Sequence, residues 1–255
     1  MATVAELSEP YRNHLIPVHP PDRGVCGVCR TAAHPDFRLC FPCNTARNEF
    51  RQGLADVAVP IALAVKREQL AHELWHYKHD VDPGVRAQPT MRLGAVLWRF
   101  LGQHEKHIAE AAGVPGFGTV TTVPGTRKRD GEHPLERIVG TLVGHTKSRY
   151  EPLLALGQGG APSHTLAADR YRATRALRDE PAVLLIDDTW TTGGNAQSAA
   201  LALRAAGAGA AKVAIVVVGR HFDRSFRYCE TYYQQAKAVK FTWDSCCLEP
   251  STEAA

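Results

Sequence analysis

The stretch VLLIDDTWTTGGNAQSAA (residues 183–200) decides the fold class, because it joins a strand, a loop and a helix without interruption. Its apolar run has the length of a buried strand and ends at two carboxylates, Asp187 and Asp188. Ligands of open parallel sheets bind at the carboxyl ends of the strands. The acidic pair is therefore expected to face a ligand crevice, although an acidic strand end without such a role remains the alternative.

The loop after the acidic pair is built from residues that suit an anion. Its hydroxyls and glycines are supplied by Thr189, Thr191, Thr192, Gly193 and Gly194. Glycines let the backbone approach a ligand closely, and Asn195 is a good N-cap for the helix that follows. The N–H groups at a helix start bind anions, whereas carboxylates accept hydrogen bonds from sugar hydroxyls. A ribose 5-phosphate fits both features, and the Gly-Lys-Ser/Thr of a Walker loop is absent.

Strands and helices alternate over the rest of the chain. Apolar or β-branched runs predict strands at 118–124, 182–188 and 211–219, with a weaker candidate at 151–157. Helical periodicity is seen at 65–78, 91–112, 133–145 and 195–207. Strands that are apolar along their whole length indicate a parallel sheet covered on both faces, so the expected class is α/β. Residues 1–24 contain four prolines and are expected to form a tail or an extended lead-in.

Four of the seven cysteines form two C-x-x-C pairs, Cys26/Cys29 and Cys40/Cys43. Two such pairs complete a tetrahedral zinc site, and four protein ligands leave no open position, so a structural Zn²⁺ is expected. Unrelated thiols or a redox pair are the alternative. No role is assigned to Cys229, Cys246 or Cys247. Arginines and phenylalanines near the pairs suit single-stranded nucleic acid, but Phe37, Phe41 and Phe50 are expected to form the core of the module.

The composition is that of an ordinary globular protein. The 255 residues are 44% hydrophobic and 22% charged, and the formal net charge of +4 suits phosphorylated ligands or nucleic acid without requiring either. The N-terminus lacks a signal-peptide pattern, and the longest apolar runs have the length of strands. A cytoplasmic protein with no membrane partner is expected. The scattered histidines, His72, His76 and His79 among them, are expected at the surface.

The motif VLLIDDTWTTGG resembles the signature of type I phosphoribosyltransferases. The resemblance implies that Asp187 and Asp188 hold the ribose hydroxyls of phosphoribosyl pyrophosphate. It also implies that Thr189, Thr191, Thr192, Gly193, Gly194 and Asn195 form the 5′-phosphate cradle, and that Mg²⁺ accompanies the pyrophosphate. Asn195 stands where many members have threonine. Thr191 stands where members that use 6-oxopurines have an aspartate, which argues against those substrates.

A second phosphate loop is expected after the strand at 118–124. The resemblance assigns pyrophosphate contacts to Gly125, Thr126 and Arg127, with Arg127 as a catalytic residue beside the acidic pair. Further contacts are expected from Pro124, Lys128 and Arg129. An exposed charged turn is the alternative. Arg170, in a second basic stretch, is expected to be solvated.

A four-cysteine module before a phosphoribosyltransferase domain resembles the ComF family of competence proteins. The implied domains are a tail (1–24), a zinc module (25–50), a helical linker or hood (51–116) and a phosphoribosyltransferase domain (117–255). The sequence LWHYK (residues 74–78) resembles the Lys-Tyr motif of that family in reversed order. Two functions stay open: a phosphoribosyltransferase acting on an unknown nitrogen acceptor, or a non-catalytic phosphoribosyl-pyrophosphate-binding module in DNA uptake or processing. In the second, the zinc module would bind single-stranded DNA or a DNA-processing protein.

Overall fold

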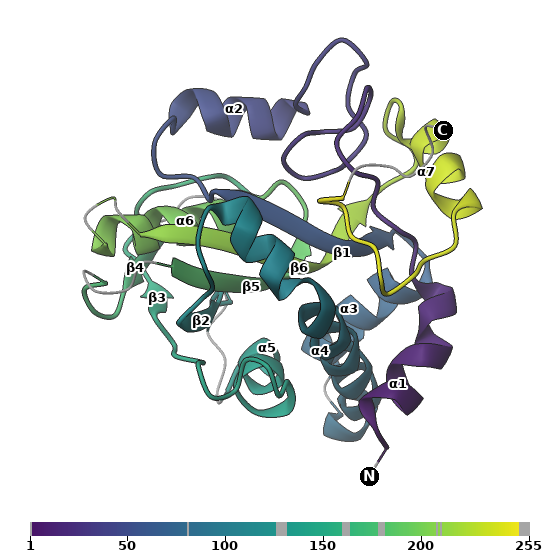
Figure 1. Ribbon diagram of the computed structural model, residues 1–255, viewed down its shortest axis with the longest axis horizontal. Coiled ribbons are helices and arrows are strands. Elements are labelled where there is room, and N and C mark those ends of the chain that lie inside the picture. The colour runs from purple at the N-terminus through teal and green to yellow at the C-terminus, as the bar shows by residue number, and fades with distance from the viewer. Residues whose placement is uncertain are drawn as a thin grey trace.

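A four-stranded parallel sheet forms the centre of the protein (Figure 1). The computed structural model describes residues 2–80, 82–125, 132–159, 164–177, 182–207, 209 and 211–249. The strand order is β1-β6-β5-β2, and all three pairings are parallel. The strands are β1 (Val57–Val65), β2 (Thr119–Thr122), β5 (Ala182–Trp190) and β6 (Lys212–Phe222). The predicted α/β class with a parallel sheet is confirmed.

Helices cover both faces of this sheet, which explains why β1 and the central parts of β5 and β6 are apolar on both faces. On one face Leu184 and Ile186 of β5 share a core with four helices: α1 (Val4–Tyr11), α3 (Gln69–His79), α4 (Pro83–Ala112) and α7 (Cys229–Ala238). On the other face Val183 and Leu185 pack with α6 (Gly194–Ala206) and with three of the clustered cysteines. The alternating side chains of β5 are therefore buried on either side.

Shorter elements complete the described chain. Helix α2 (Phe41–Glu49) has Cys40 at its N-cap and contains Cys43, and β3 (Leu154–Leu156) pairs antiparallel with β4 (Tyr171–Ala173). The helix expected at 133–145 is a short α5 (Pro134–Arg137) that continues as a π-helical turn, η2 (Ile138–Leu142). A 3-10 turn, η1 (Arg12–His14), follows α1. Among the described residues, no helix has both the length and the apolar character needed to cross a bilayer.

The expected helical linker at 51–116 contains a strand that the sequence analysis missed. Strand β1 carries Pro60, which lacks an N–H for a central ladder. The sheet tolerates this proline because β1 lies at its edge and pairs with β6. The missing N–H of Pro60 removes no ladder hydrogen bond when it faces the free edge, so the apolar run VAVPIALAV can form a strand. The first predicted helix consequently begins at Gln69, after the strand.

The N-terminal segment is not a detached tail. Helix α1 begins with a capping box in which Thr3 and Glu6 exchange hydrogen bonds. Arg99 of α4 donates to Glu9 at 2.5 Å, and Figure 1 shows the two helices side by side. The extended residues after α1 bury Leu15 and Ile16 in the main core. Packing against α4 thus stabilises a helix that is too short to persist alone.

Candidate functional site

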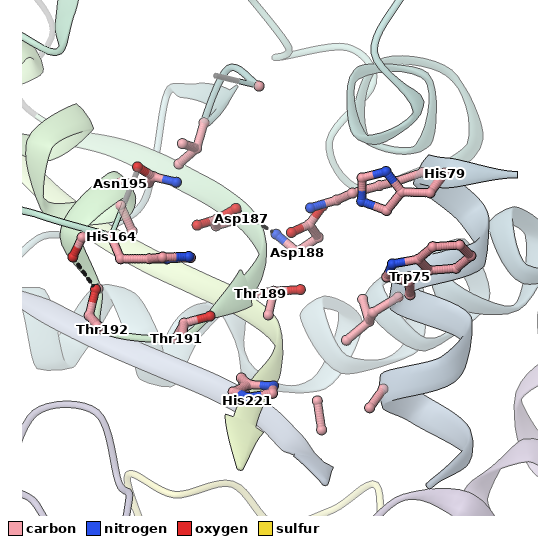
Figure 2. Close-up of a pocket in the computed structure, with 18 of the residues that line it drawn as sticks. Trp75, His79, His164, Asp187, Asp188, Thr189, Thr191, Thr192, Asn195 and His221 are labelled. Atoms are coloured by element: carbon pink, nitrogen blue, oxygen red, sulfur yellow. Dashed lines mark hydrogen bonds and ion pairs between the residues drawn. The ribbon is translucent and has the colours of Figure 1, made fainter. Parts of the chain in front are cut away.

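A cavity of about 640 Å³ opens at the carboxyl ends of the parallel strands (Figure 2). Its wall combines the ends of β1, β5 and β6, the first turn of α6, and α3 across from them. The loop after β2 contributes Val123, Pro124 and Gly125. The cavity is therefore at the place where open parallel sheets bind their ligands.

The acidic pair lies at the base of this cavity, and both carboxylates are nearly buried. Asp187 is 8% exposed and Asp188 is 3% exposed. The backbone N–H of Asp188 donates to Asp187 Oδ1 at 2.9 Å. The Tyr77 hydroxyl donates to Asp188 Oδ2, and Lys78 Nζ forms an ion pair with the same oxygen. The LWHYK segment of α3 thus contacts the acidic pair directly, although the two are more than a hundred residues apart.

The two carboxyl groups differ in their electrostatics. Burial, followed by the charge of Asp188, raises the pKa of Asp187 to about 7. Burial also opposes ionisation of Asp188, but the charge and hydrogen bond of Lys78 and the Tyr77 hydroxyl outweigh it and lower the pKa of Asp188. The surroundings therefore favour the ionised form of Asp188 and the protonated form of Asp187.

The loop after β5 is held in place by contacts with a neighbouring segment. Thr192 Oγ1 donates to the His164 carbonyl at 2.5 Å and accepts from Gly194 N at 3.2 Å. Gly193 has φ = 86°, and a Cβ there would collide with the Trp190 ring. Asn195 was expected to cap α6, but the N-cap is Gly193. The left-handed turn at Gly193 already directs the chain into the helix. Asn195 lies in the first turn and lines the cavity.

Every described residue that was expected to contact phosphoribosyl pyrophosphate lines this one cavity. They are Pro124, Gly125, Asp187, Asp188, Thr189, Thr191, Thr192, Gly193, Gly194 and Asn195. The Tyr171 hydroxyl donates to the Pro124 carbonyl at 3.1 Å and fixes the start of the second loop. Thr126, Arg127, Lys128 and Arg129 lie outside the described residues.

The cavity also carries cationic and titratable residues that the sequence analysis did not place there. Lys66 and Arg67 follow β1, and Lys78 extends from α3. Six histidines line the wall: His72, His76, His79, His133, His164 and His221. His72, His76 and His79 are partly or fully exposed, as expected, but they face the ligand space beside the exposed Trp75. His221 follows an apolar strand as Asp187 does, so the same strand-end argument would have identified it.

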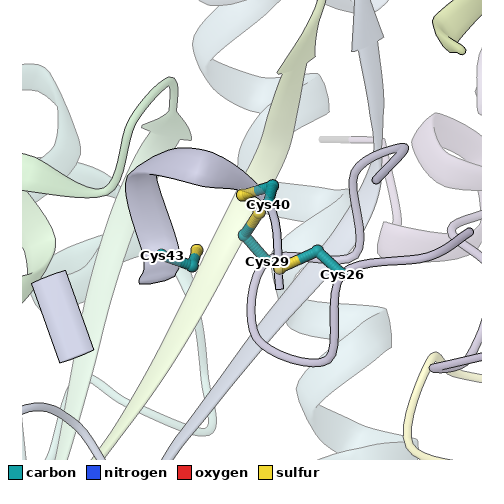
Figure 3. A group of neighbouring side chains, drawn as sticks. All are labelled: Cys26, Cys29, Cys40 and Cys43. Atoms are coloured by element: carbon teal, nitrogen blue, oxygen red, sulfur yellow. Dashed lines mark hydrogen bonds between the residues drawn. The ribbon is translucent and has the colours of Figure 1, made fainter. Parts of the chain in front are cut away.

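The four paired cysteines come together as their spacing predicts (Figure 3). All four sulfurs lie within 4.8 Å of one another, and Cys29 Sγ is 3.6 Å from Cys40 Sγ. Tetrahedral zinc with Zn–S bonds of about 2.3 Å would separate its sulfurs by about 3.8 Å. The cluster therefore suits a metal ion such as Zn²⁺.

A buried arginine connects this cysteine cluster to the cavity. Arg220 of β6 is 6% exposed and donates to the Trp190 carbonyl at 2.9 Å. Burial alone would lower the pKa of Arg220, but the neighbouring thiolates, Cys29 first, raise it. Trp190 in turn packs against Gly193 of the loop after β5. A continuous chain of contacts thus runs from the cysteine cluster through Arg220 and Trp190 to the loop after β5.

Two further expectations are wrong, and the structure places the three cysteines that had no assigned role. Arg170 is 5% exposed and donates to the Thr165 carbonyl at 2.7 Å, so the expected solvated position is wrong. Phe37 and Phe41 are 65% and 82% exposed and do not form a core for the cysteine module. Cys229 and Cys247 are buried free thiols, and Cys246 is partly buried.

Comparisons of the chain with protein-family models, with curated proteins and with solved structures found no match.

Proposed function

We propose that this protein is a phosphoribosyltransferase, with a type I phosphoribosyltransferase fold, that binds phosphoribosyl pyrophosphate with Mg²⁺ and transfers phosphoribose to a nitrogen acceptor. The observation that carries the proposal is the convergence of three features on one cavity. These are a buried acidic pair, a Thr/Gly loop that opens a helix, and a cationic wall.

The acidic pair suits the ribose hydroxyls. Carboxylate oxygens accept hydrogen bonds and are unsuited to phosphate, so Asp187 and Asp188 select the sugar. The loop at 189–195 suits the 5′-phosphate, because the first N–H groups of α6 have no partner within the helix and point toward its N-terminal end. Sugar and phosphate are bound side by side on one strand–loop–helix unit.

The charge of the wall supports a polyanionic ligand. Lys66, Arg67 and Lys78 line the cavity, where Lys66 pairs with Asp223 and Lys78 with Asp188, and six histidines lie beside them. Such groups bind and stabilise a pyrophosphate as it departs. Gly125 lies on the same wall, where its backbone suits the pyrophosphate, and Arg127 is assigned to the reaction by the resemblance alone.

The chemistry is a displacement at the anomeric carbon. The bond from C1 to the pyrophosphate oxygen breaks, the acceptor nitrogen forms the new bond, and positive charge develops on the ribose in between. The buried carboxylates hold the hydroxyls and stabilise that charge. Mg²⁺, held by oxygens of the ligand itself, would neutralise the leaving pyrophosphate.

Phosphorus NMR of phosphoribosyl pyrophosphate with Mg²⁺, the protein, and a mixture of nitrogen bases and ammonia tests this proposal. Free pyrophosphate is expected with the wild type and not with Asp187→Asn/Asp188→Asn. The control is Asp82→Asn, because that residue caps α4 outside the cavity and asparagine also caps helices. Line broadening without turnover would indicate a binding protein, and an unchanged spectrum would refute the assignment of the acidic pair.

A second candidate function, single-stranded nucleic-acid binding by the cysteine module, is favoured by its exposed aromatic side chains. Phe37 and Phe41 are largely exposed, and Arg38 and Arg47 are exposed near them in the sequence. Bases stack on such rings while arginines contact the backbone. Anisotropy of a labelled single-stranded oligonucleotide should show salt-dependent binding that Phe37→Ala/Phe41→Ala removes. Binding that is unaffected by this double change would refute the interpretation.

A further inference from the structure

A second cluster of potential metal ligands lies outside the cavity, where the C-terminal segment meets α4. His104 and His107 stand one turn apart on α4, and Glu249 belongs to the segment after α7. One ligand atom from each of the three lies within 4.8 Å of the other two. None of the three side chains lines the cavity described above. The proposed transferase function therefore does not account for this cluster.

The geometry of His104 fixes its tautomer. The side chain is 1% exposed, and Nε2 lies 2.7 Å from the Trp243 carbonyl. A carbonyl can only accept, so Nε2 carries the proton and Nδ1 presents a lone pair. Nδ1 is buried without a hydrogen-bond partner among the described residues, 4.0 Å from Glu249 Oε1. A buried imidazole nitrogen left in this state is costly unless something binds it.

The other two ligands surround that lone pair. His107 Nδ1 lies 3.4 Å from Glu249 Oε1, and both side chains are partly exposed. The Cys246 N–H donates to Glu249 Oε2 at 3.4 Å and orients the carboxylate. The hydrogen bonds from His104 to Trp243 and from Cys246 to Glu249 are of the kind that orient metal ligands. Two ring nitrogens and one carboxylate oxygen thus converge at the edge of the buried core, where two of the three side chains are partly exposed.

We propose that His104, His107 and Glu249 bind a divalent transition-metal ion, Zn²⁺ in the first place, with water completing the coordination. Two imidazoles and a carboxylate are a donor set that zinc accepts on three protein ligands. Because Glu249 is separated from α4 by most of the chain, the ion would fasten the C-terminal segment to that helix. This site is independent of the proposed transferase function.

Zinc content and cobalt spectra of the tag-free full chain test this site. The variant His107→Ala/Glu249→Gln leaves the buried His104 in place and is expected to fold. Wild type should hold one more equivalent of zinc per chain than this variant. With Co²⁺, the variant should lose a weak d–d contribution and keep the thiolate charge-transfer band of the cysteine cluster.

The control is Glu110→Gln, which removes an exposed carboxylate from the same helix. It should keep the zinc content of the wild type. Equal zinc content in wild type and His107→Ala/Glu249→Gln would overturn the proposal. Loss of the same equivalent in Glu110→Gln would also overturn it, because the binding would then be non-specific.

Discussion

Gly193 combines two constraints that no other residue type meets. Its φ of 86° is disfavoured for a side chain, and a Cβ would occupy the space of the Trp190 ring. We expect Gly193→Ala to destabilise the fold by about 2–4 kcal/mol, with about 1 kcal/mol from the backbone and the rest from displaced packing. It should also abolish binding of phosphoribosyl pyrophosphate. Urea unfolding and isothermal titration calorimetry measure the two effects.

Gly113→Ala is the matched control for this change. Gly113 has φ = 72°, and a Cβ there meets no atom within 4 Å. Gly113→Ala should lower the free energy of unfolding only by the backbone contribution, about 1 kcal/mol, and should leave ligand binding intact. Equal losses of stability in the two variants would show that Trp190 does not constrain the loop.

The raised pKa of Asp187 predicts a pH-dependent affinity. Below about pH 7 this carboxyl group carries a proton and no longer offers both oxygens to ribose hydroxyls. Affinity for phosphoribosyl pyrophosphate should therefore fall as pH decreases through 7, approaching about tenfold per pH unit. Calorimetry on either side of neutrality measures this slope.

Asp187→Asn separates this effect from protonation of the ligand's own phosphates, which the variant leaves unchanged. The variant should bind more weakly than the wild type at high pH, with a shallower pH dependence. Identical slopes in both proteins would remove Asp187 as the titrating group.

At the scale of elements, the packing of α3 on the sheet determines what contacts the acidic pair. Leu74 of α3 lies against Gly219 of β6, where a Cβ would collide with it. A Cβ there would also crowd Ala64 of β1, so Gly219→Ala should displace α3 from the sheet, separate Tyr77 and Lys78 from Asp188, and cost about 1–3 kcal/mol. The free energy of unfolding, measured by chemical denaturation, and the affinity for phosphoribosyl pyrophosphate should both decrease.

Gly116→Ala serves as the reference for this prediction, since a Cβ there has no neighbour within 4 Å. It should leave both measurements unchanged. If Gly219→Ala lowered stability without weakening ligand binding, the position of α3 would not control the acidic pair.

The parts of the fold that could be predicted from the sequence are those with a strong local signal. Strand β5, the glycine loop and α6 are continuous in sequence, and all of their predicted ligand residues line the cavity. Strand β1 was missed because Pro60 is acceptable only at an edge, and an edge position is a property of the assembled sheet.

The histidines of α3 could not be placed for a related reason. Their helical spacing shows that they share a face, but not what that face meets. The same limit applies to His104, whose burial depends on a C-terminal segment distant in sequence. Contacts between segments far apart in the chain are set by tertiary packing, which one sequence does not encode in any local pattern.

At the scale of the whole molecule, the cysteine cluster is part of the same core as the sheet. Cys26, Cys29 and Cys43 share one apolar cluster with Trp190 and with Ala196 of α6. A metal ion there would hold the segment that packs over Arg220, and Arg220 supports the Trp190 carbonyl. The cysteine cluster should therefore control the position of the loop after β5, although the cluster lines no part of the cavity.

Metal removal tests this coupling. A strong zinc chelator should lower the melting temperature, because structural zinc contributes on the order of 10 kcal/mol to a small unit. Zinc removal should also weaken phosphoribosyl pyrophosphate binding through Arg220 and Trp190. We expect a loss of about tenfold or more in affinity, which corresponds to the free energy of one charged hydrogen bond. The measurement belongs in the His107→Ala/Glu249→Gln background, where the cysteine cluster is the remaining proposed zinc site. Unchanged ligand affinity after complete zinc removal would mean that the cysteine module and the cavity are energetically independent.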